Sequence, residues 1–134
     1  MSESILVVDD SADNRELTQI LLEFDGFEVR IAEDATQALS LLKSYRPSLI
    51  LMDVQLPGMD GLELTRRLRQ DTSLQGVPIV ALSAYAMAAE KANALAAGCD
   101  GYITKPINTR TFASTVRQYL ELAAPARRVF GVSA

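Results

Sequence analysis

The sequence of 134 residues contains no histidine, which removes the commonest general base and any metal site built on histidine. A single cysteine, Cys99, has no partner for an internal disulfide. No apolar run is long enough to span a bilayer, and the N-terminus (Met-Ser-Glu-Ser) lacks the basic segment of a signal peptide. These absences predict a cytoplasmic protein that is not inserted in a membrane.

Positive charge is also scarce. The chain has 13 basic and 17 acidic residues, so its net charge is −4. Nucleic acids and anionic membranes attract basic surfaces, so this charge argues against both as partners. The apolar content of 49% and the charged content of 22% are typical of a globular chain, long enough for one domain with a substantial core.

The fold is organised around residues 49–58, Leu-Ile-Leu-Met-Asp-Val-Gln-Leu-Pro-Gly. Four apolar residues followed by Asp53 predict a strand that is buried on both faces and ends on a carboxylate. Pro57 and Gly58 prevent the strand from continuing. Because burying an unpaired carboxylate is costly, we expect a cation or hydrogen-bond donors next to Asp53.

Four further short apolar runs predict strands. They occupy residues 4–8, 27–32, 77–82 and 101–104. A helical pattern follows each of the five strands, and this alternation predicts an α/β fold with a parallel five-stranded sheet and helices on both faces. Right-handed crossovers leave few topologies, and the flavodoxin-like three-layer sandwich with strand order 2-1-3-4-5 is one of the two common ones. The alternating pattern of the second strand suits an edge of the sheet.

Helix starts are predicted from capping residues and helix faces from apolar spacing. The capping residues are Asp13, Asp34, Asp60 and Asn108. The inward stripe of the first helix is predicted to be Leu17, Ile20, Leu21 and Phe24. An alanine-rich helix is expected at 86–97. The domain should span residues 1–122, followed by a flexible tail at 123–134, which lacks periodicity.

The predicted C-terminal strand ends carry five polar side chains. They are Asp9, Asp10, Asp53, Ser83 and Lys105. Taken singly, an aspartate pair is commonly a turn or a helix cap, and a serine or lysine at a strand end is commonly surface. The functional interpretation therefore depends on all five residues meeting at one edge of the sheet, where ligands bind in folds of this kind.

Together these five side chains favour phosphoryl chemistry. Three carboxylates in one crevice repel each other, so at least one should have a raised pKa unless a cation is bound, and Mg²⁺ suits such a site. An ammonium, a hydroxyl and a metal describe a site for a phosphoryl group in transfer. Asp53, on the central strand, is the expected nucleophile and would form an aspartyl phosphate.

Four segments resemble the motifs of a known family. They are Val7-Val8-Asp9-Asp10, Leu51-Met52-Asp53-Val54-Gln55-Leu56-Pro57-Gly58-Met59-Asp60-Gly61, Ala81-Leu82-Ser83-Ala84 and Gly101-Tyr102-Ile103-Thr104-Lys105-Pro106. From about residue 5 to residue 122, the chain resembles the receiver domain of two-component response regulators, the CheY-like superfamily. Within that family it looks most like stand-alone regulators of the DivK type or the receivers of hybrid kinases.

The resemblance implies a phosphorelay switch. Asp53 would accept a phosphoryl group from a phosphohistidine of a histidine kinase or a histidine phosphotransfer protein. Because the chain has no histidine of its own, that donor acts in trans. Mg²⁺ would be bound by the carboxylates of Asp10 and Asp53 and by the backbone carbonyl of Gln55, with Asp9 acting mainly through water.

The remaining motif residues would sense the phosphoryl group. Lys105 would contact it, and the bond from Lys105 to Pro106 is expected to be cis. Ser83 would hydrogen-bond a phosphoryl oxygen, and Tyr102 would then turn inward. The face made by the fourth helix, the fifth strand and the fifth helix would change shape and be read by a downstream protein, or by a second copy in a homodimer.

Two positions vary within the family pattern. Ser83 is often threonine, so the lost methyl group would loosen the switch. Gln55 and Tyr85 flank the path of the hydrolytic water, and Tyr85 is bulky and has no carboxylate. We therefore expect autodephosphorylation to be slow. Apart from this reaction and its own phosphorylation, the protein is expected to be a signalling protein and not an enzyme.

Two other functions compete with this interpretation. A Mg²⁺-dependent phosphatase of the haloacid-dehalogenase type also uses a strand-end aspartate, but it needs a second aspartate where this chain has Gln55. A nucleotide or flavin binder would need a glycine-rich phosphate loop after the first strand, where this chain has Asp9 and Asp10.

Overall fold

Strands and helices alternate along the whole chain. The computed structural model describes residues 3–84 and 87–133, and side chains up to residue 123. The strands are β1 (Ser4–Val8), β2 (Glu28–Ala32), β3 (Leu49–Asp53), β4 (Ile79–Ser83) and β5 (Gly101–Thr104). The helices are α1 (Ala12–Phe24), α2 (Ala35–Leu42), α3 (Gly61–Arg69), the 3₁₀ turn η1 (Thr72–Leu74), α4 (Ala88–Ala97) and α5 (Phe112–Ser133). Within the described residues, no helix is both long enough and apolar enough to cross a membrane.

The five strands form one parallel sheet in the order β2-β1-β3-β4-β5, which confirms the predicted topology. β2 lies at an edge, as its alternating pattern indicated. In the register of the sheet, Val8 lies beside Met52 and Asp53 beside Leu82. The C-terminal ends of β1, β3 and β4 therefore meet at one edge, and their polar residues follow there.

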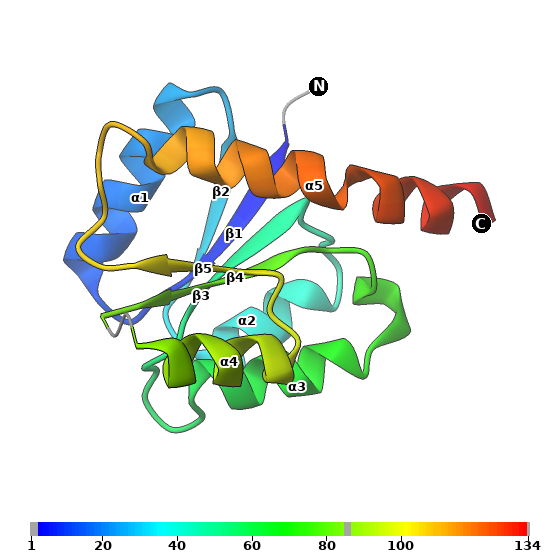
Figure 1. Ribbon diagram of the computed structural model, residues 1–134, viewed down its shortest axis with the longest axis horizontal. Helices are drawn as coiled ribbons and strands as arrows, with labels where there is room; N and C mark the ends of the chain where they lie inside the picture. The colour runs from blue at the N-terminus through cyan, green and yellow to red at the C-terminus, as the bar shows by residue number, and fades with distance from the viewer. Residues whose placement is uncertain (1–2, 85–86, 134) are drawn as a thin grey trace.

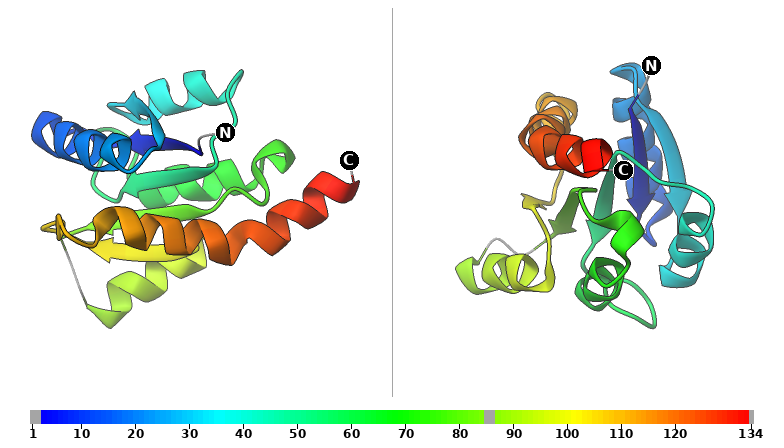
Figure 2. Two further views of the ribbon diagram at one scale, coloured as in Figure 1. Left: turned by 90° about the horizontal axis from the view of Figure 1, so that it is seen from above. Right: turned by 90° about the vertical axis from the view of Figure 1, so that its right-hand side faces the viewer.

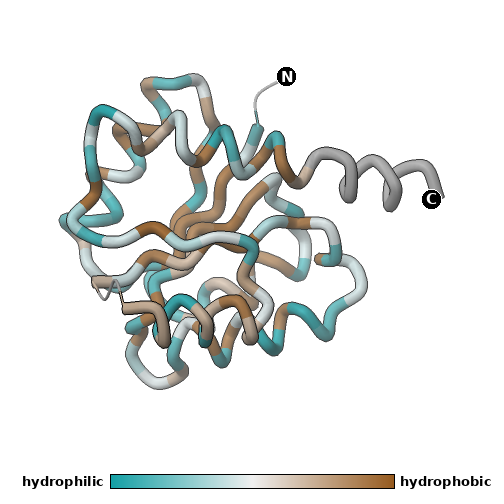
Figure 3. Tube along the Cα trace, viewed as in Figure 1, coloured by the Kyte–Doolittle hydropathy of each residue, from teal (hydrophilic) through white to brown (hydrophobic). Residues whose placement is uncertain are grey.

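Helices cover both faces of this sheet. Helices α1 and α5 lie on one face, and α2, α3 and α4 lie on the other (Figures 1 and 2). Alternate residues of the central strands face opposite cores: in β3, Ile50 belongs to the core under α2 and α3, and Leu51 to the core under α1 and α5. The hydrophobic colouring in Figure 3 accordingly concentrates on the strands in the middle of the domain. Burial on both faces explains why the strand sequences are continuous apolar runs.

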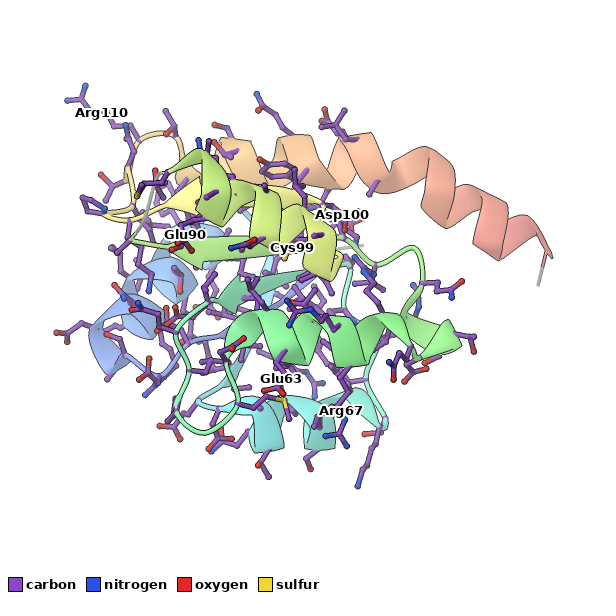
Figure 4. The ribbon with its side chains drawn as sticks, turned by 60° about the horizontal axis from the view of Figure 1, so that its bottom comes forward. Glu63, Arg67, Glu90, Cys99, Asp100 and Arg110 are labelled. Atoms are coloured by element: carbon purple, nitrogen blue, oxygen red, sulfur yellow. The ribbon has the colours of Figure 1, made fainter. Side chains whose placement is uncertain are left out.

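Cys99 lies at the junction between α4 and β5, just before Asp100 (Figure 4). Its side chain is buried in the core, where an unpaired cysteine packs as a small apolar residue. Burial also raises the pKa of the Cys99 thiol, which keeps it protonated and unreactive.

The structure corrects two expectations for α1. The N-cap is Ser11, whose Oγ accepts a hydrogen bond from the Asn14 amide at 3.3 Å, and Asp13 lies inside the first turn. The predicted stripe is also wrong, because Ile20 and Phe24 are exposed, with Phe24 93% accessible. The buried residues are Leu22 and Thr18, a threonine whose hydroxyl donates to a carbonyl of the preceding turn. Because a carbonyl of the same helix accepts the hydrogen bond of its hydroxyl, Thr18 can occupy the inner face although it is polar.

Two helix boundaries also differ from prediction. Asn108 opens a turn and does not cap the last helix: its Oδ1 accepts from the Arg110 amide at 3.0 Å, and α5 begins only at Phe112. At its other end, α5 continues to Ser133, through the segment that lacks a periodic pattern. That residues 123–134 form a flexible tail stays a prediction. Other capping predictions are confirmed, since Asp34 caps α2 and Asp60 caps α3.

Candidate functional site

Three carboxylates gather at the C-terminal edge of the sheet. Asp9 and Asp10 follow β1 directly, and Asp53 is the last residue of β3, the neighbouring strand. Each contributes a carboxylate oxygen, and these oxygens lie within 4.8 Å of one another. Asp9 and Asp53 are buried, whereas Asp10 is exposed. The adjacency of β1 and β3 therefore brings together residues that lie more than forty positions apart in sequence.

Lys105 supplies the positive charge of the site. Its Nζ lies 3.4 Å from Oδ2 of Asp9 and 3.4 Å from Oδ2 of Asp53, so one ammonium bridges two buried carboxylates. The Lys105–Pro106 peptide bond is cis, as the family resemblance implied. The Lys105 amide donates to the carbonyl of Ser83 at 2.7 Å, which ties the end of β5 to the end of β4.

The other predicted site residues take different positions. Ser83 ends β4 and is buried, on the same sheet edge as the carboxylates. Gln55 is exposed, and its backbone amide donates to Oδ1 of Asp53 at 3.0 Å. Tyr102 lies in β5, is half-buried and packs against the core on the α4 side. Tyr85, on which the expectation of slow autodephosphorylation rests, lies outside the described residues.

The pKa of Asp53 is raised to about 6. Burial is the main cause, and the negative charge of Asp9 adds to it, while the Gln55 amide and the Lys105 ammonium act in the opposite direction. One carboxyl pKa is raised, as expected, but burial contributes more to the rise than the repulsion between carboxylates from which it was predicted. The raised pKa means that the ionised form of Asp53 is destabilised in the folded protein, and a bound divalent cation would stabilise it.

This raised pKa predicts how stability changes with pH in the metal-free protein. An aspartate in the unfolded chain titrates near 3.8, so between that pH and about 6 the folded state binds more protons than the unfolded state. The contribution of Asp53 to stability therefore falls as pH rises from 4 to 7. Asp53→Asn cannot titrate, and we expect it to be more stable than wild type at pH 7.5 by roughly 1–3 kcal/mol.

Urea unfolding in EDTA at pH 4 and pH 7.5, followed by circular dichroism, measures this difference. Asp60→Asn is the matched control, because Asp60 is an exposed cap of α3 and asparagine caps equally well. A stability difference between Asp53→Asn and wild type that does not change with pH would contradict the prediction.

The donor set fits Mg²⁺. All three side-chain ligands offered are carboxylates, the hard oxygen donors that Mg²⁺ prefers, and none is a nitrogen or sulfur donor. One of the three, Asp10, is exposed, so solvent reaches the cluster and a bound ion could keep several waters, as Mg²⁺ does. The residues present are therefore suited to this cation.

Two residues near the site were not singled out in the sequence. Gly61 begins α3 so close to β3 that a Cβ atom there would lie 2.0 Å from the Asp53 carbonyl oxygen. Arg15, in the first turns of α1, donates from Nη1 to the backbone carbonyl of Asp9 at 2.9 Å. The only sequence signal for Arg15 was a lone arginine in an otherwise acidic segment just after Asp9 and Asp10.

Comparison with known proteins identifies a matching family and similar proteins. The profile of the response regulator receiver domain family matches residues 5–117. The polar-differentiation response regulator DivK of Brucella anthropi is 38% identical over 120 residues, which cover 90% of this chain and 98% of DivK.

Solved structures show the same likeness. A CheY-like response regulator receiver domain protein from Methanospirillum hungatei superposes with a TM-score of 0.84 at 31% identity, over 94% of this chain and 99% of that one. The receiver domain of a signal transduction histidine kinase from Syntrophus aciditrophicus gives a TM-score of 0.81 at 32% identity, over 90% and 91% of the two chains.

Proposed function

The chain belongs to the response regulator receiver domain family, and on this premise we propose that it is a phosphorelay switch whose phosphoacceptor is Asp53. The donor is a phosphohistidine of a histidine kinase or a histidine phosphotransfer protein. A carboxylate oxygen of Asp53 forms a bond to phosphorus while the bond from phosphorus to the histidine nitrogen breaks. These 134 residues contain no histidine, so the donor histidine lies outside them.

One observation carries this proposal: a buried carboxylate at a strand end with an ammonium 3.4 Å away and two further carboxylates beside it. The Gln55 amide holds Oδ1 of Asp53, and the Lys105 ammonium lies at Oδ2. Lys105 is therefore placed to neutralise charge on the incoming phosphoryl oxygens. The raised pKa of Asp53 supports the proposal too, because strongly perturbed carboxyl groups beside a specific charge partner are typical of functional sites.

Mg²⁺ would be held by the carboxylates of Asp10 and Asp53 and the backbone carbonyl of Gln55, with Asp9 acting mainly through water. When bound, it would neutralise the charge that gathers on the phosphoryl group during transfer. Asp9 is engaged by protein groups as well, since its Oδ1 accepts from the Ser11 amide at 2.9 Å and its Oδ2 faces Lys105. These bonds favour a supporting role for Asp9.

Phosphorylation would shift the domain between two conformations. The Ser83 hydroxyl would bond a phosphoryl oxygen, and Tyr102 would turn inward beside it, changing the surface formed by α4, β5 and α5. Met87, before α4, is exposed and could contact a downstream protein or a second copy on this surface. Complete switching, from 1:99 to 99:1, requires that the phosphoryl group favour one conformation by about 5.5 kcal/mol.

The first test is intact mass spectrometry after incubation with Mg²⁺ and acetyl phosphate. We expect the protein to gain one phosphoryl group, and the adduct to be labile at alkaline pH because it is an acyl phosphate. EDTA should prevent the gain. An adduct that forms equally well in EDTA would contradict the role of the divalent cation.

A further inference from the structure

Arg15 connects α1 to the end of β1. Its Nη1 donates to the backbone carbonyl of Asp9 at 2.9 Å, and its Nη2 lies 3.1 Å from Oε1 of Glu33. The side chain of Arg15 is only 16% exposed and its bond to the Asp9 carbonyl is partly buried, whereas Glu33 is 57% exposed, so its contact with Arg15 is open to solvent. A charge-assisted bond from a planar guanidinium fixes the direction of its acceptor better than a neutral donor does.

The carbonyl that Arg15 holds belongs to the peptide group joining Asp9 to Asp10. The orientation of this peptide sets where the Asp10 backbone points its side chain. The Asp9 amide on the other side is held by the carbonyl of Ala32 at 3.1 Å, and the Asp9 carboxylate by Ser11 and Lys105. Asp10 differs: among the described residues, its carboxylate has no hydrogen bond or ion pair of its own. The backbone is therefore what sets the direction in which the Asp10 side chain leaves the chain.

Arg15 is itself held in place from α2. Oε2 of Glu33 accepts from Nε2 of Gln37 at 3.2 Å, and the Glu33 amide donates to Oε1 of Gln37 at 2.8 Å. A continuous set of contacts thus runs from the first turns of α2 through Glu33 and Arg15 to the carbonyl of Asp9. Outer contacts of this kind orient metal ligands, and their loss typically weakens metal binding.

We infer that Arg15 is a positioning residue for the divalent cation: by holding the Asp9–Asp10 peptide, it aims the Asp10 carboxylate into the site. The inference rests on the proposed function, because it requires the carboxylate cluster to bind Mg²⁺. It also predicts an effect opposite in sign to simple electrostatics. Removing a nearby positive charge should strengthen cation binding, whereas loss of positioning should weaken it.

The test measures the Mg²⁺ dissociation constant by isothermal titration calorimetry at pH 7.5. Arg15→Ala should bind Mg²⁺ about 10-fold more weakly than wild type. Arg15→Lys keeps the charge and one donor but not the planar fork, so its affinity should lie between the two. Phosphorylation by acetyl phosphate should need more Mg²⁺ in Arg15→Ala but reach a rate within about two-fold of wild type at saturation.

Arg117→Ala is the matched control. Arg117 also donates to one backbone carbonyl and one carboxylate, both of Asp25. These bonds join α5 to the end of α1, away from the cluster of Asp9, Asp10 and Asp53. Its loss should leave the Mg²⁺ affinity unchanged. Circular dichroism checks that each variant is folded. If Arg15→Ala does not fold, the Mg²⁺ affinity of Arg15→Lys alone tests the inference.

The outcomes separate the two proposals. Wild type that binds no Mg²⁺ would overturn the proposed metal site, and the inference with it. Wild type that binds Mg²⁺, together with Arg15→Ala of equal or higher affinity, would overturn the inference alone. An equal loss in Arg117→Ala would also overturn it, because the effect would then reflect general destabilisation. Weaker binding only in the Arg15 variants supports the inference.

Discussion

Asp53→Asn is expected to abolish phosphorylation: after incubation with Mg²⁺ and acetyl phosphate, its intact mass should not change, while wild type gains one phosphoryl group. Asparagine keeps the shape of the side chain and can still accept the hydrogen bond from the Gln55 amide. It lacks the anionic oxygen that attacks phosphorus and one charge of the cation site. We expect the rate of adduct formation to fall at least about 1,000-fold, as it does when an enzyme loses its nucleophile.

The control for this experiment is Asp60→Asn, in the loop that follows Asp53. Asp60 is exposed and caps α3 by accepting from the Glu63 amide at 2.8 Å, a role that asparagine also fills. It should gain the phosphoryl group as wild type does. An adduct on Asp53→Asn would mean that a neighbouring carboxylate is the acceptor. No adduct on any of the proteins would point to a receiver that accepts only from its own protein partner.

Gly61→Ala is expected to lower the free energy of unfolding by about 3 kcal/mol, at the upper end of the range for overpacking. The added Cβ would lie 2.0 Å from the carbonyl oxygen of Asp53 and 2.9 Å from Cα of Val54. Both are backbone atoms at the end of a central strand, and no side chain can move aside to make room. Either α3 or the end of β3 must shift, so we expect phosphorylation at Asp53 to slow as well.

Gly58→Ala provides the comparison, because Gly58 lies in the loop just before α3 and a Cβ there meets nothing within 4 Å. Its φ of 81° is a left-handed conformation, which costs an alanine only about 1 kcal/mol. Urea unfolding of the two variants separates steric contact from backbone preference. A loss in Gly61→Ala no larger than that in Gly58→Ala would show that the close approach is relieved elsewhere.

The first helix shows where reasoning from the sequence stops. Its apolar residues include Leu17, Ile20, Leu21, Leu22 and Phe24, which together cover more than one face. Several stripes are therefore compatible with the helical period, and the packing of α1 against the sheet and α5 selects the one containing Leu22. Thr18 joins it only because its hydroxyl is satisfied by the carbonyl of Asn14, a local bond that no apolar pattern reveals.

The sequence by itself determined the strands, their parallel direction and the five polar residues at the strand ends, and it narrowed the strand order to two common choices, because each of these depends on local patterns and on rules of chain connection. Only the tertiary structure decided the close approach of Gly61 to Asp53, the bond from Arg15 to the Asp9 carbonyl and the raised pKa of Asp53. These three depend on distances between backbone segments, and on burial from several directions at once. Neither quantity is encoded in the identity or spacing of the residues concerned.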